Sequence, residues 1–202
     1  MKALLSHITI AFVLALTTVV MLAAPASAQP TAIFVDDDFP GDSPAEHLWT
    51  TITKGIADAT PGAGDTIYVG PGTYYESIVV NVSNLTLQGY SSSEVTVDGQ
   101  GAQYTVRVSA EDVSLRQLRI IGGSIAGVRW ESVQKGYLES NVVTGNYYGI
   151  WIASLLNQTI QCNEIYGNSQ DGIYVTNSTM KDVSSNNIYS NGRHGITLLN
   201  SS

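Results

Sequence analysis

The sequence of 202 residues is poor in cysteine and in positive charge. Its single cysteine, Cys162, excludes an intramolecular disulfide, and we expect this lone thiol to be buried as a small apolar side chain. Nine Lys and Arg stand against seventeen Asp and Glu, which gives a formal net charge of −8. Because nucleic acid binds to basic surfaces, this balance argues against nucleic acid as a partner. It also disfavours an anionic polysaccharide, unless a cation bridges the two.

A long apolar run occurs only once, near the start of the chain. It follows Lys2 and ends just before the small residues Ala26-Ser27-Ala28. This layout is typical of a secretory signal peptide, residues 1–28, although a membrane anchor would also fit a run of this length. We therefore expect a secreted, extracellular or cell-surface protein, periplasmic in a Gram-negative bacterium, with no stable membrane span after cleavage.

Helical periodicity is missing from residues 66–202, and a repeat takes its place. Glycine followed by an aliphatic residue recurs at spacings of 22, 23 and 23, in Gly127-Val128, Gly149-Ile150, Gly172-Ile173 and Gly195-Ile196. Asparagine keeps the same period, in Asn141, Asn163 and Asn186. A fixed period of this length is typical of repeat architectures.

The pattern inside each repeat indicates the kind of repeat. Apolar residues alternate with others, as in Ile173-Tyr174-Val175, which predicts a strand with one buried face. Clusters of Gly, Asn, Ser and Asp between these segments predict turns. The sequence therefore predicts an all-β fold, a parallel β-helix over residues 66–202 with coils of about 22–23 residues stacked about 4.8 Å apart. Stacked asparagines would form an amide ladder along its axis.

The two ends of the predicted stack differ. Residues 29–65 are interpreted as a strand, an acidic loop and a short amphipathic helix at 50–59, which Thr50 or Thr51 would cap and which would cover the first coil. At the other end the last coil is incomplete, with no covering segment after it. We expect either a truncated piece of a longer β-helix or end-to-end self-association through the open coil.

Three segments carry a resemblance to a known family: residues 51–80, residues 84–99 and the N-x-I/V…N…G-I coils from Asn141 onward. They resemble the pectin-lyase-like superfamily of right-handed parallel β-helices, and in particular NosD-like and right-handed β-helix repeat proteins. The resemblance implies this fold with a surface or periplasmic location. It implies no single activity, because the fold hosts lyases, hydrolases, epimerases, adhesins and inert spacers.

The catalytic and copper-binding residues that such relatives would imply are largely missing. Of the polygalacturonase motifs, only residues 193–195 show a faint similarity, and we interpret His194 as a variable turn residue. Copper delivery, the function attached to the NosD-like name, requires imidazole, thiolate or thioether ligands. His47, His194, Met180 and Cys162 are scattered without ligand spacing, which argues against copper binding by this chain.

The densest carboxylates are Asp36, Asp37, Asp38 and Asp42. Calcium favours several hard oxygen ligands on one loop, so a structural calcium ion is the one cofactor that this loop suits. The alternative is a solvated loop without metal, because the calcium ligands of the lyases lie on the coils and this run precedes them.

Aromatic residues recur at matching places in adjacent coils, Trp151 with Tyr174 and Tyr166 with Tyr189. If their aliphatic neighbours point inward, the rings point outward in columns that offer flat surfaces to sugar rings. We name these four residues as carbohydrate-binding candidates, with cell-surface or extracellular polysaccharide as the partner. The alternative is that Tyr and Trp occur here only because they are common in strands.

Five N-glycosylation sequons occur in the chain, at Asn81, Asn84, Asn157, Asn177 and Asn200. A chain this rich in Asn, Ser and Thr contains some by chance, and their use requires an organism with N-glycosylation.

These observations favour a secreted or cell-surface β-helix module with a structural or carbohydrate-binding role and no catalysis of its own. The alternative is a fragment or relative of a polysaccharide lyase, hydrolase or epimerase. A NosD-like copper-delivery protein ranks third.

Overall fold

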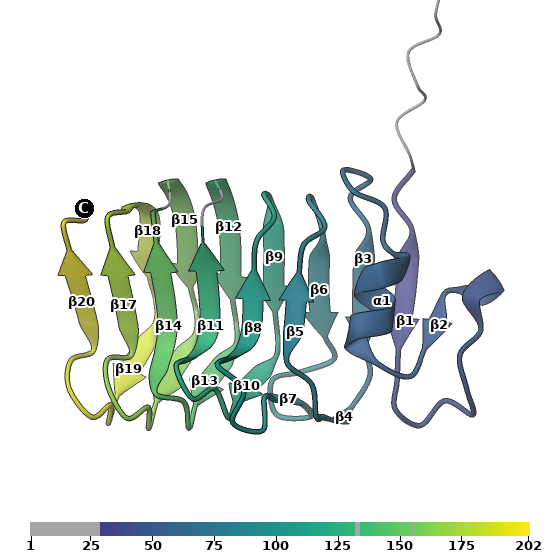
Figure 1. Ribbon diagram of the computed structural model, residues 1–202, viewed down its shortest axis with the longest axis horizontal. Coiled ribbons are helices and arrows are strands. Elements are labelled where there is room, and N and C mark those ends of the chain that lie inside the picture. Colours follow the sequence, from purple (N-terminus) through teal and green to yellow (C-terminus); the bar gives the residue numbers. More distant parts are fainter. Residues whose placement is uncertain (1–28, 132–133, 155) are drawn as a thin grey trace, which may run out of the picture.

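The structure, a computed structural model, describes residues 29–131, 134–154 and 156–202. The predicted signal peptide, residues 1–28, lies outside the described residues. Figure 1 shows a stack of short strands that runs along the long axis of the molecule. Six successive turns each contribute one strand to each of three parallel sheets, so the predicted parallel β-helix is confirmed.

The three sheets are named A, B and C in the order in which each turn visits them. The eight-stranded sheet A consists of β1 (Ala32–Val35), β2 (Leu48–Trp49), β3 (Thr66–Val69), β6 (Thr86–Gly89), β9 (Val113–Arg116), β12 (Gln134–Glu139), β15 (Leu156–Gln161) and β18 (Thr179–Ser184). Sheet B consists of β4 (Gly72–Tyr74), β7 (Val95–Asp98), β10 (Arg119–Ile121), β13 (Val142–Thr144), β16 (Glu164–Tyr166) and β19 (Asn187–Tyr189). Sheet C consists of β5 (Ile78–Val80), β8 (Tyr104–Val108), β11 (Ala126–Glu131), β14 (Tyr148–Ala153), β17 (Ile173–Thr176) and β20 (Ile196–Leu199). A 3₁₀-helix, η1 (Pro44–Glu46), and an α-helix, α1 (Ile52–Asp58), complete the described elements.

Like residues lie above one another in the interior, as the sequence period predicts. On sheet C, Ile150 pairs in register with Ile173, and Ile173 pairs with Ile196. Ile150 and Ile173 are fully buried in a single hydrophobic core that extends through the stack. Burying a side chain of this size stabilises the fold by about 1.5–3 kcal/mol, so each complete coil adds its own increment.

Two asparagine ladders run along the stack. In the predicted ladder, between sheets A and B, Asn141 Nδ2 donates to Asn163 Oδ1 at 3.1 Å and Asn163 Nδ2 donates to Asn186 Oδ1 at 3.0 Å. These amides also bond the backbone, since Asn163 Nδ2 donates to the carbonyl oxygen of Leu138 and Asn163 Oδ1 accepts the N–H of Asn141. An unexpected second ladder with the same geometry lies between sheets B and C and consists of Asn146, Asn168 and Asn191.

The repeated glycine has a steric cause. A Cβ atom on Gly172 would lie 2.8 Å from Nδ2 of Asn191, and one on Gly149 would lie 2.9 Å from Nδ2 of Asn168. The second ladder therefore fills the space that a side chain would need. The glycine period and the period of Asn146, Asn168 and Asn191 are therefore two consequences of one packing arrangement.

The predicted capping helix is α1, which begins after Thr51, as expected. Figure 1 shows α1 at the N-terminal end of the stack, in front of β1 and β3. Its buried residues Ile52 and Ile56 belong to the hydrophobic core. The carboxylate of Glu76, from the first coil, accepts the N–H of Ile52 at 2.9 Å and thereby binds a backbone donor that the helix leaves free.

Sheet A begins before residue 66. β1 pairs with β3 in register over its whole length, from Ala32 opposite Thr66 to Val35 opposite Val69. The strand expected within residues 29–65 is therefore an integral part of the stacked sheet.

The expectation of a buried Cys162 is wrong, because this side chain is exposed. Cys162 has a φ of 57°, close to the values of Ser140 (58°) and Ser185 (56°) at equivalent places in the coils before and after it. Each lies in the left-handed turn between sheets A and B, just before the inward-pointing asparagine. The position belongs to an outward turn and not to the core.

The last strand of each sheet is β18, β19 or β20. Ile196 and its neighbours Leu198 and Leu199 are about half exposed, whereas Ile173 one coil earlier is fully buried. End-to-end association through this surface stays a prediction. Among the described residues, no helix is long and apolar enough to cross a membrane.

Candidate functional site

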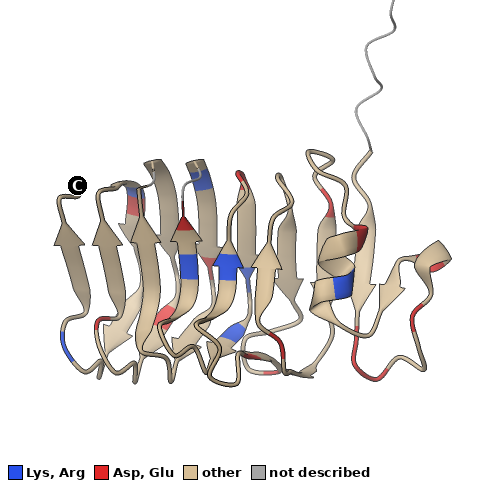
Figure 2. Cartoon of the chain, viewed as in Figure 1, with Lys and Arg blue, Asp and Glu red and all other residues tan. Residues whose placement is uncertain are grey.

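The outward face of sheet C carries one column of large side chains. Arg107, Arg129, Trp151 and Tyr174 follow each other in register on β8, β11, β14 and β17. Figure 2 shows the basic residues as blue bands on β8 and β11. No charged residue occurs in β14, β17 or β20. The column therefore changes along the axis from guanidinium groups to aromatic rings.

Trp151 lies between its neighbours in this column and is half buried, not freely exposed as expected. The guanidinium carbon of Arg129 lies 4.0 Å from the centroid of the Trp151 ring, a cation–π contact. On the side of the next coil, the Tyr174 ring centroid lies 6.1 Å away. Arg129 covers one face of the indole, and Tyr174 approaches the ring at an interplanar angle of 55°, so we expect a ligand to contact mainly the edge of the indole.

Two further tyrosines, Tyr147 and Tyr148, lie beside this column. The Tyr148 ring stacks on Tyr174 with centroids 4.9 Å apart and an interplanar angle of 13°, and Tyr147 meets Tyr148 edge-on at 5.1 Å. Burial, with a smaller effect of Tyr147, raises the pKa of Tyr148 above its usual value. We call Tyr147, Tyr148, Trp151 and Tyr174 the aromatic cluster. The sequence reasoning missed Tyr147 and Tyr148, although the Tyr-Tyr pair directly before the repeated glycine was a visible signal.

The positive charge next to the aromatic cluster is partly neutralised. Glu131 forms ion pairs with both Arg107 and Arg129, the latter with 3.4 Å between Arg129 Nε and Glu131 Oε2. Two guanidinium groups thus share one carboxylate. This part of the face carries a small positive charge on a protein that is acidic as a whole.

The second predicted aromatic pair lies on a different sheet. Tyr166 and Tyr189 are in register on β16 and β19, with centroids 5.0 Å apart and an interplanar angle of 8°. Tyr189 donates its hydroxyl hydrogen to Glu164 at 2.7 Å, and this hydrogen bond raises the pKa of Tyr189 to about 12. Both predicted pairs form columns, but the fold does not bring them into one site.

Two of the four aspartates of the predicted calcium loop, Asp36 and Asp42, have separate partners. Asp42 forms an ion pair with Lys54 at 2.5 Å and accepts the N–H of Thr50 at 2.9 Å, and these contacts lower its pKa to about 2. Asp36 accepts the N–H of Asp38 at 3.0 Å. Within residues 29–131, 134–154 and 156–202, no group of three or more His, Cys, Asp or Glu is placed to hold a metal ion.

The potential copper ligands are also kept apart. His47 Nδ1 lies 2.7 Å from Asp58 Oδ2 at the N-terminal end of the stack. Cys162 lies in the turn between β15 and β16, and His194 lies in the turn before β20. Met180 packs against the core on sheet A. This donor set does not fit a copper site.

The five sequon asparagines are all exposed and lie along one edge of the molecule. Asn81 and Asn84 lie between β5 and β6, Asn177 lies between β17 and β18, Asn157 is the second residue of β15, and Asn200 follows β20. These positions are at the turns from sheet C to sheet A, which form the upper edge in Figure 1.

The stacked parallel sheets define the class of the protein as a parallel β-helix. An alginate lyase from Paenibacillus sp. strain FPU-7 has a similar structure, with a TM-score of 0.59 at 15% identity over 84% of this chain and 65% of that one. Pectin methylesterase PemA from Erwinia chrysanthemi has a TM-score of 0.57 at 16% identity, over 73% of this chain and 54% of that one. Pectate lyase Pel9A has a TM-score of 0.54 at 14% identity, over 83% of this chain and 56% of that one. At these identities the likeness concerns the fold.

The chain belongs to the NosD family. The model of this family, described as "Periplasmic copper-binding protein (NosD)", matches residues 59–202. A cell surface glycoprotein of Methanothermus fervidus is 32% identical over 103 residues. This match covers 51% of the chain and only 17% of the glycoprotein.

Proposed function

We propose that this protein is an extracellular or periplasmic surface module that binds a polysaccharide through the aromatic cluster on sheet C. The observation that carries the proposal is the gathering of Tyr147, Tyr148, Trp151 and Tyr174 on the outward side of β14 and β17. None of these rings is needed to fill the core, which the inward aliphatic residues of the same strands already occupy.

The chemistry of the cluster suits a sugar chain. Tyrosine and tryptophan combine apolar ring surface with a polar group, as recognition of amphipathic sugar rings requires. Trp151 Nε1 is buried and has no hydrogen-bond partner within the described part of the chain, so the indole would contact a sugar through its apolar ring edge. Arg129 supports the indole from the preceding coil, with a side chain that is itself largely buried. A sugar lying across β14 and β17 would meet ring edges and tyrosine hydroxyl groups together.

Two comparisons support the location. The matched family is described as periplasmic, and the similar glycoprotein of Methanothermus fervidus is described as a cell surface protein. The predicted signal peptide agrees with both. A structural role at the surface and carbohydrate binding are compatible, because a rigid stack can hold its outward columns at fixed spacing.

A glycan array followed by titration of the strongest ligand tests this proposal. Trp151→Ala should weaken binding about tenfold or more, which corresponds to about 1.4 kcal/mol. Val79→Ala is the matched control, because Val79 precedes Arg107 in the same outward column and is also exposed. Melting curves must accompany both variants, since Trp151 is half buried. Binding that is equal in the wild type and in a folded Trp151→Ala variant contradicts the proposal.

The enzymatic alternative is tested in parallel, because the similar structures include lyases and esterases. The purified chain is incubated with polygalacturonate, alginate and methylated pectin in the presence of calcium. We expect no unsaturated ends, no new reducing ends and no released methanol. Turnover that scales with protein concentration would replace the binding role by a catalytic one.

A further inference from the structure

The outward face of sheet A carries a second column, which lies on a different sheet from the aromatic cluster. Phe34, Tyr68, Gln88, Arg116 and Glu139 follow each other in register on β1, β3, β6, β9 and β12. Adjacent strands of a sheet are about 4.8 Å apart. The column therefore begins with two aromatic rings and continues with an amide, a guanidinium and a carboxylate at regular intervals.

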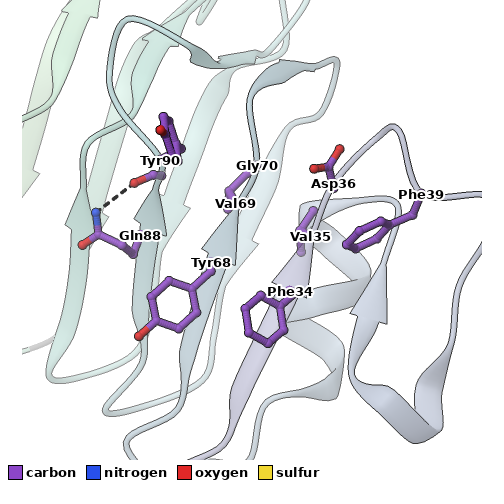
Figure 3. Close-up of a pocket in the computed structure, with 10 residues that line it drawn as sticks. Phe34, Val35, Asp36, Phe39, Tyr68, Val69, Gly70, Gln88 and Tyr90 are labelled. Atoms are coloured by element: carbon purple, nitrogen blue, oxygen red, sulfur yellow. Dashed lines mark hydrogen bonds between the residues drawn. The ribbon is translucent and has the colours of Figure 1, made fainter.

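The two aromatic rings form an open platform. Phe34 is 42% and Tyr68 is 46% exposed, and their centroids are 5.6 Å apart with an interplanar angle of 23°. Figure 3 shows the rings side by side, each seen nearly face-on. Tyr90, which is 68% exposed, and Phe39 border the same cavity of about 180 Å³. Unlike Tyr148, Trp151 and Tyr174 on sheet C, these rings keep a large part of their surface available.

Polar groups converge on this cavity. Gln88 donates from Nε2 to the carbonyl oxygen of Gly89 at 2.9 Å, the dashed line in Figure 3, and also to Oε1 of Gln117. These bonds hold the amide in place, and no hydrogen bond of the described residues uses its Oε1 atom. Asp36 borders the cavity from the opposite side. The cavity thus has aromatic surface with acceptors on two sides, which suits a ligand with several hydroxyl groups.

The cavity continues along the column. A second cavity of about 200 Å³ is bordered by Gln88, Arg116, Gln117, Glu139 and Ser140. Gln88 borders both cavities, so they adjoin along the column over five neighbouring strands, β1, β3, β6, β9 and β12, and we call the two together the groove. Arg116 and Glu139 face each other in this part with 3.4 Å between Nη2 and Oε2. A groove of this length fits several units of a linear chain better than a single sugar.

The charges select among linear ligands. Asp36 borders the aromatic end, and Asp37 and Asp38 follow it directly in the chain. The one guanidinium of the groove, Arg116, is already paired with Glu139. A ligand with regular negative charges would meet uncompensated repulsion at the aromatic end. An uncharged chain with many hydroxyl groups would not.

We propose that this sheet A groove is a second carbohydrate-binding site, which takes an uncharged linear glycan with one sugar ring on Phe34 and Tyr68. The following units lie over Gln88 and reach Arg116 and Glu139, which act as donor and acceptor for hydroxyl groups. The site is independent of the aromatic cluster on sheet C, and it extends the binding surface to another side of the stack.

The test is calorimetric titration of the purified chain with cellohexaose, mannohexaose and chitohexaose, and with a galacturonate hexasaccharide of the same length. We expect at least one neutral hexasaccharide to bind and the galacturonate to bind at least tenfold more weakly at this site. Tyr68→Ala should weaken neutral binding at least tenfold. Tyr75→Ala is the control, because Tyr75 is an exposed tyrosine that borders neither cavity, and this variant should bind the hexasaccharides as the wild type does.

Two further variants make the outcome specific. Arg116→Ala should weaken binding of the hexasaccharide more than binding of the corresponding disaccharide, because only the longer chain reaches the second cavity. Trp151→Ala should leave unchanged the neutral binding that Tyr68→Ala weakens, so failure of the proposed site on sheet C and failure of this one are separated. Lack of binding by all three neutral hexasaccharides, equal binding by Tyr68→Ala, or preference for galacturonate would each overturn the proposal.

Discussion

Ile173 shows how much one residue contributes in a stacked fold. It lies in a column between Ile150 and Ile196 and has no exposed surface. Its neighbours above and below are fixed by the sheet, so they have little freedom to fill a cavity. Ile196 has the same residue type and the same place in its coil, but it is 45% exposed. The position along the stack therefore decides what an isoleucine contributes.

We predict that Ile173→Ala lowers the free energy of unfolding by roughly 2–5 kcal/mol, the usual range for a large-to-small change in a core. Ile196→Ala is the internal control and should cost much less, because its side chain is already half in water. Urea unfolding followed by circular dichroism measures both. Equal losses for the two variants would mean that the columns do not define the core as described.

At the scale of the element, the asparagine ladders join the coils more specifically than aliphatic packing does. The amide of Asn163 binds Asn141 on one side and Asn186 on the other, and it also binds the carbonyl oxygen of Leu138. Each of these partners is a polar group inside the protein. Removing one amide leaves several buried groups without a partner.

We therefore predict that Asn163→Ala destabilises the chain by roughly 1–3 kcal/mol for each buried group left unpaired. Asn200→Ala serves as the comparison, because Asn200 also bonds an asparagine one coil away but does so at the exposed edge. Its effect should stay within about 0.5 kcal/mol. Thermal melting distinguishes the two cases. An Asn163→Ala variant that melts at the wild-type temperature would refute the structural role of the ladder.

At the scale of the whole molecule, the sides of the stack differ in chemistry. Sheets A and C carry the two outward columns, and the edge between sheet C and the next strand of sheet A carries all five sequons. Glycans on this edge would leave the outward columns on both sheets accessible. The arrangement suits a surface protein that must be both shielded and able to bind.

We propose that this edge is glycosylated where the host has N-glycosylation. Secretion from a eukaryotic host followed by peptide mass spectrometry should find glycans on several of Asn81, Asn84, Asn157, Asn177 and Asn200. Ser83→Ala should remove the modification at Asn81 and at no other site. A secreted protein in which all five asparagines are unmodified would contradict the proposal.

The residues that the sequence reasoning identified correctly lie in the regular coils. Asn141, Asn163, Ile150 and Ile173 repeat at a nearly constant spacing, so their stacking was visible without coordinates. The outward column of sheet A was not visible. Phe34, Tyr68, Gln88 and Arg116 stack in register although they are 34, 20 and 28 residues apart, because the connections between the first coils differ in length.

The sequence by itself determined the fold class and the inward columns, since a repeated side chain can be buried only if successive coils place it above its equivalent. Tertiary structure alone decided what each outward residue can do. Cys162 is exposed because its turn is left-handed, and Trp151 is half covered because Arg129 lies on its ring. Phe34 and Tyr68 meet because sheet pairing, and not sequence spacing, places one strand beside the next.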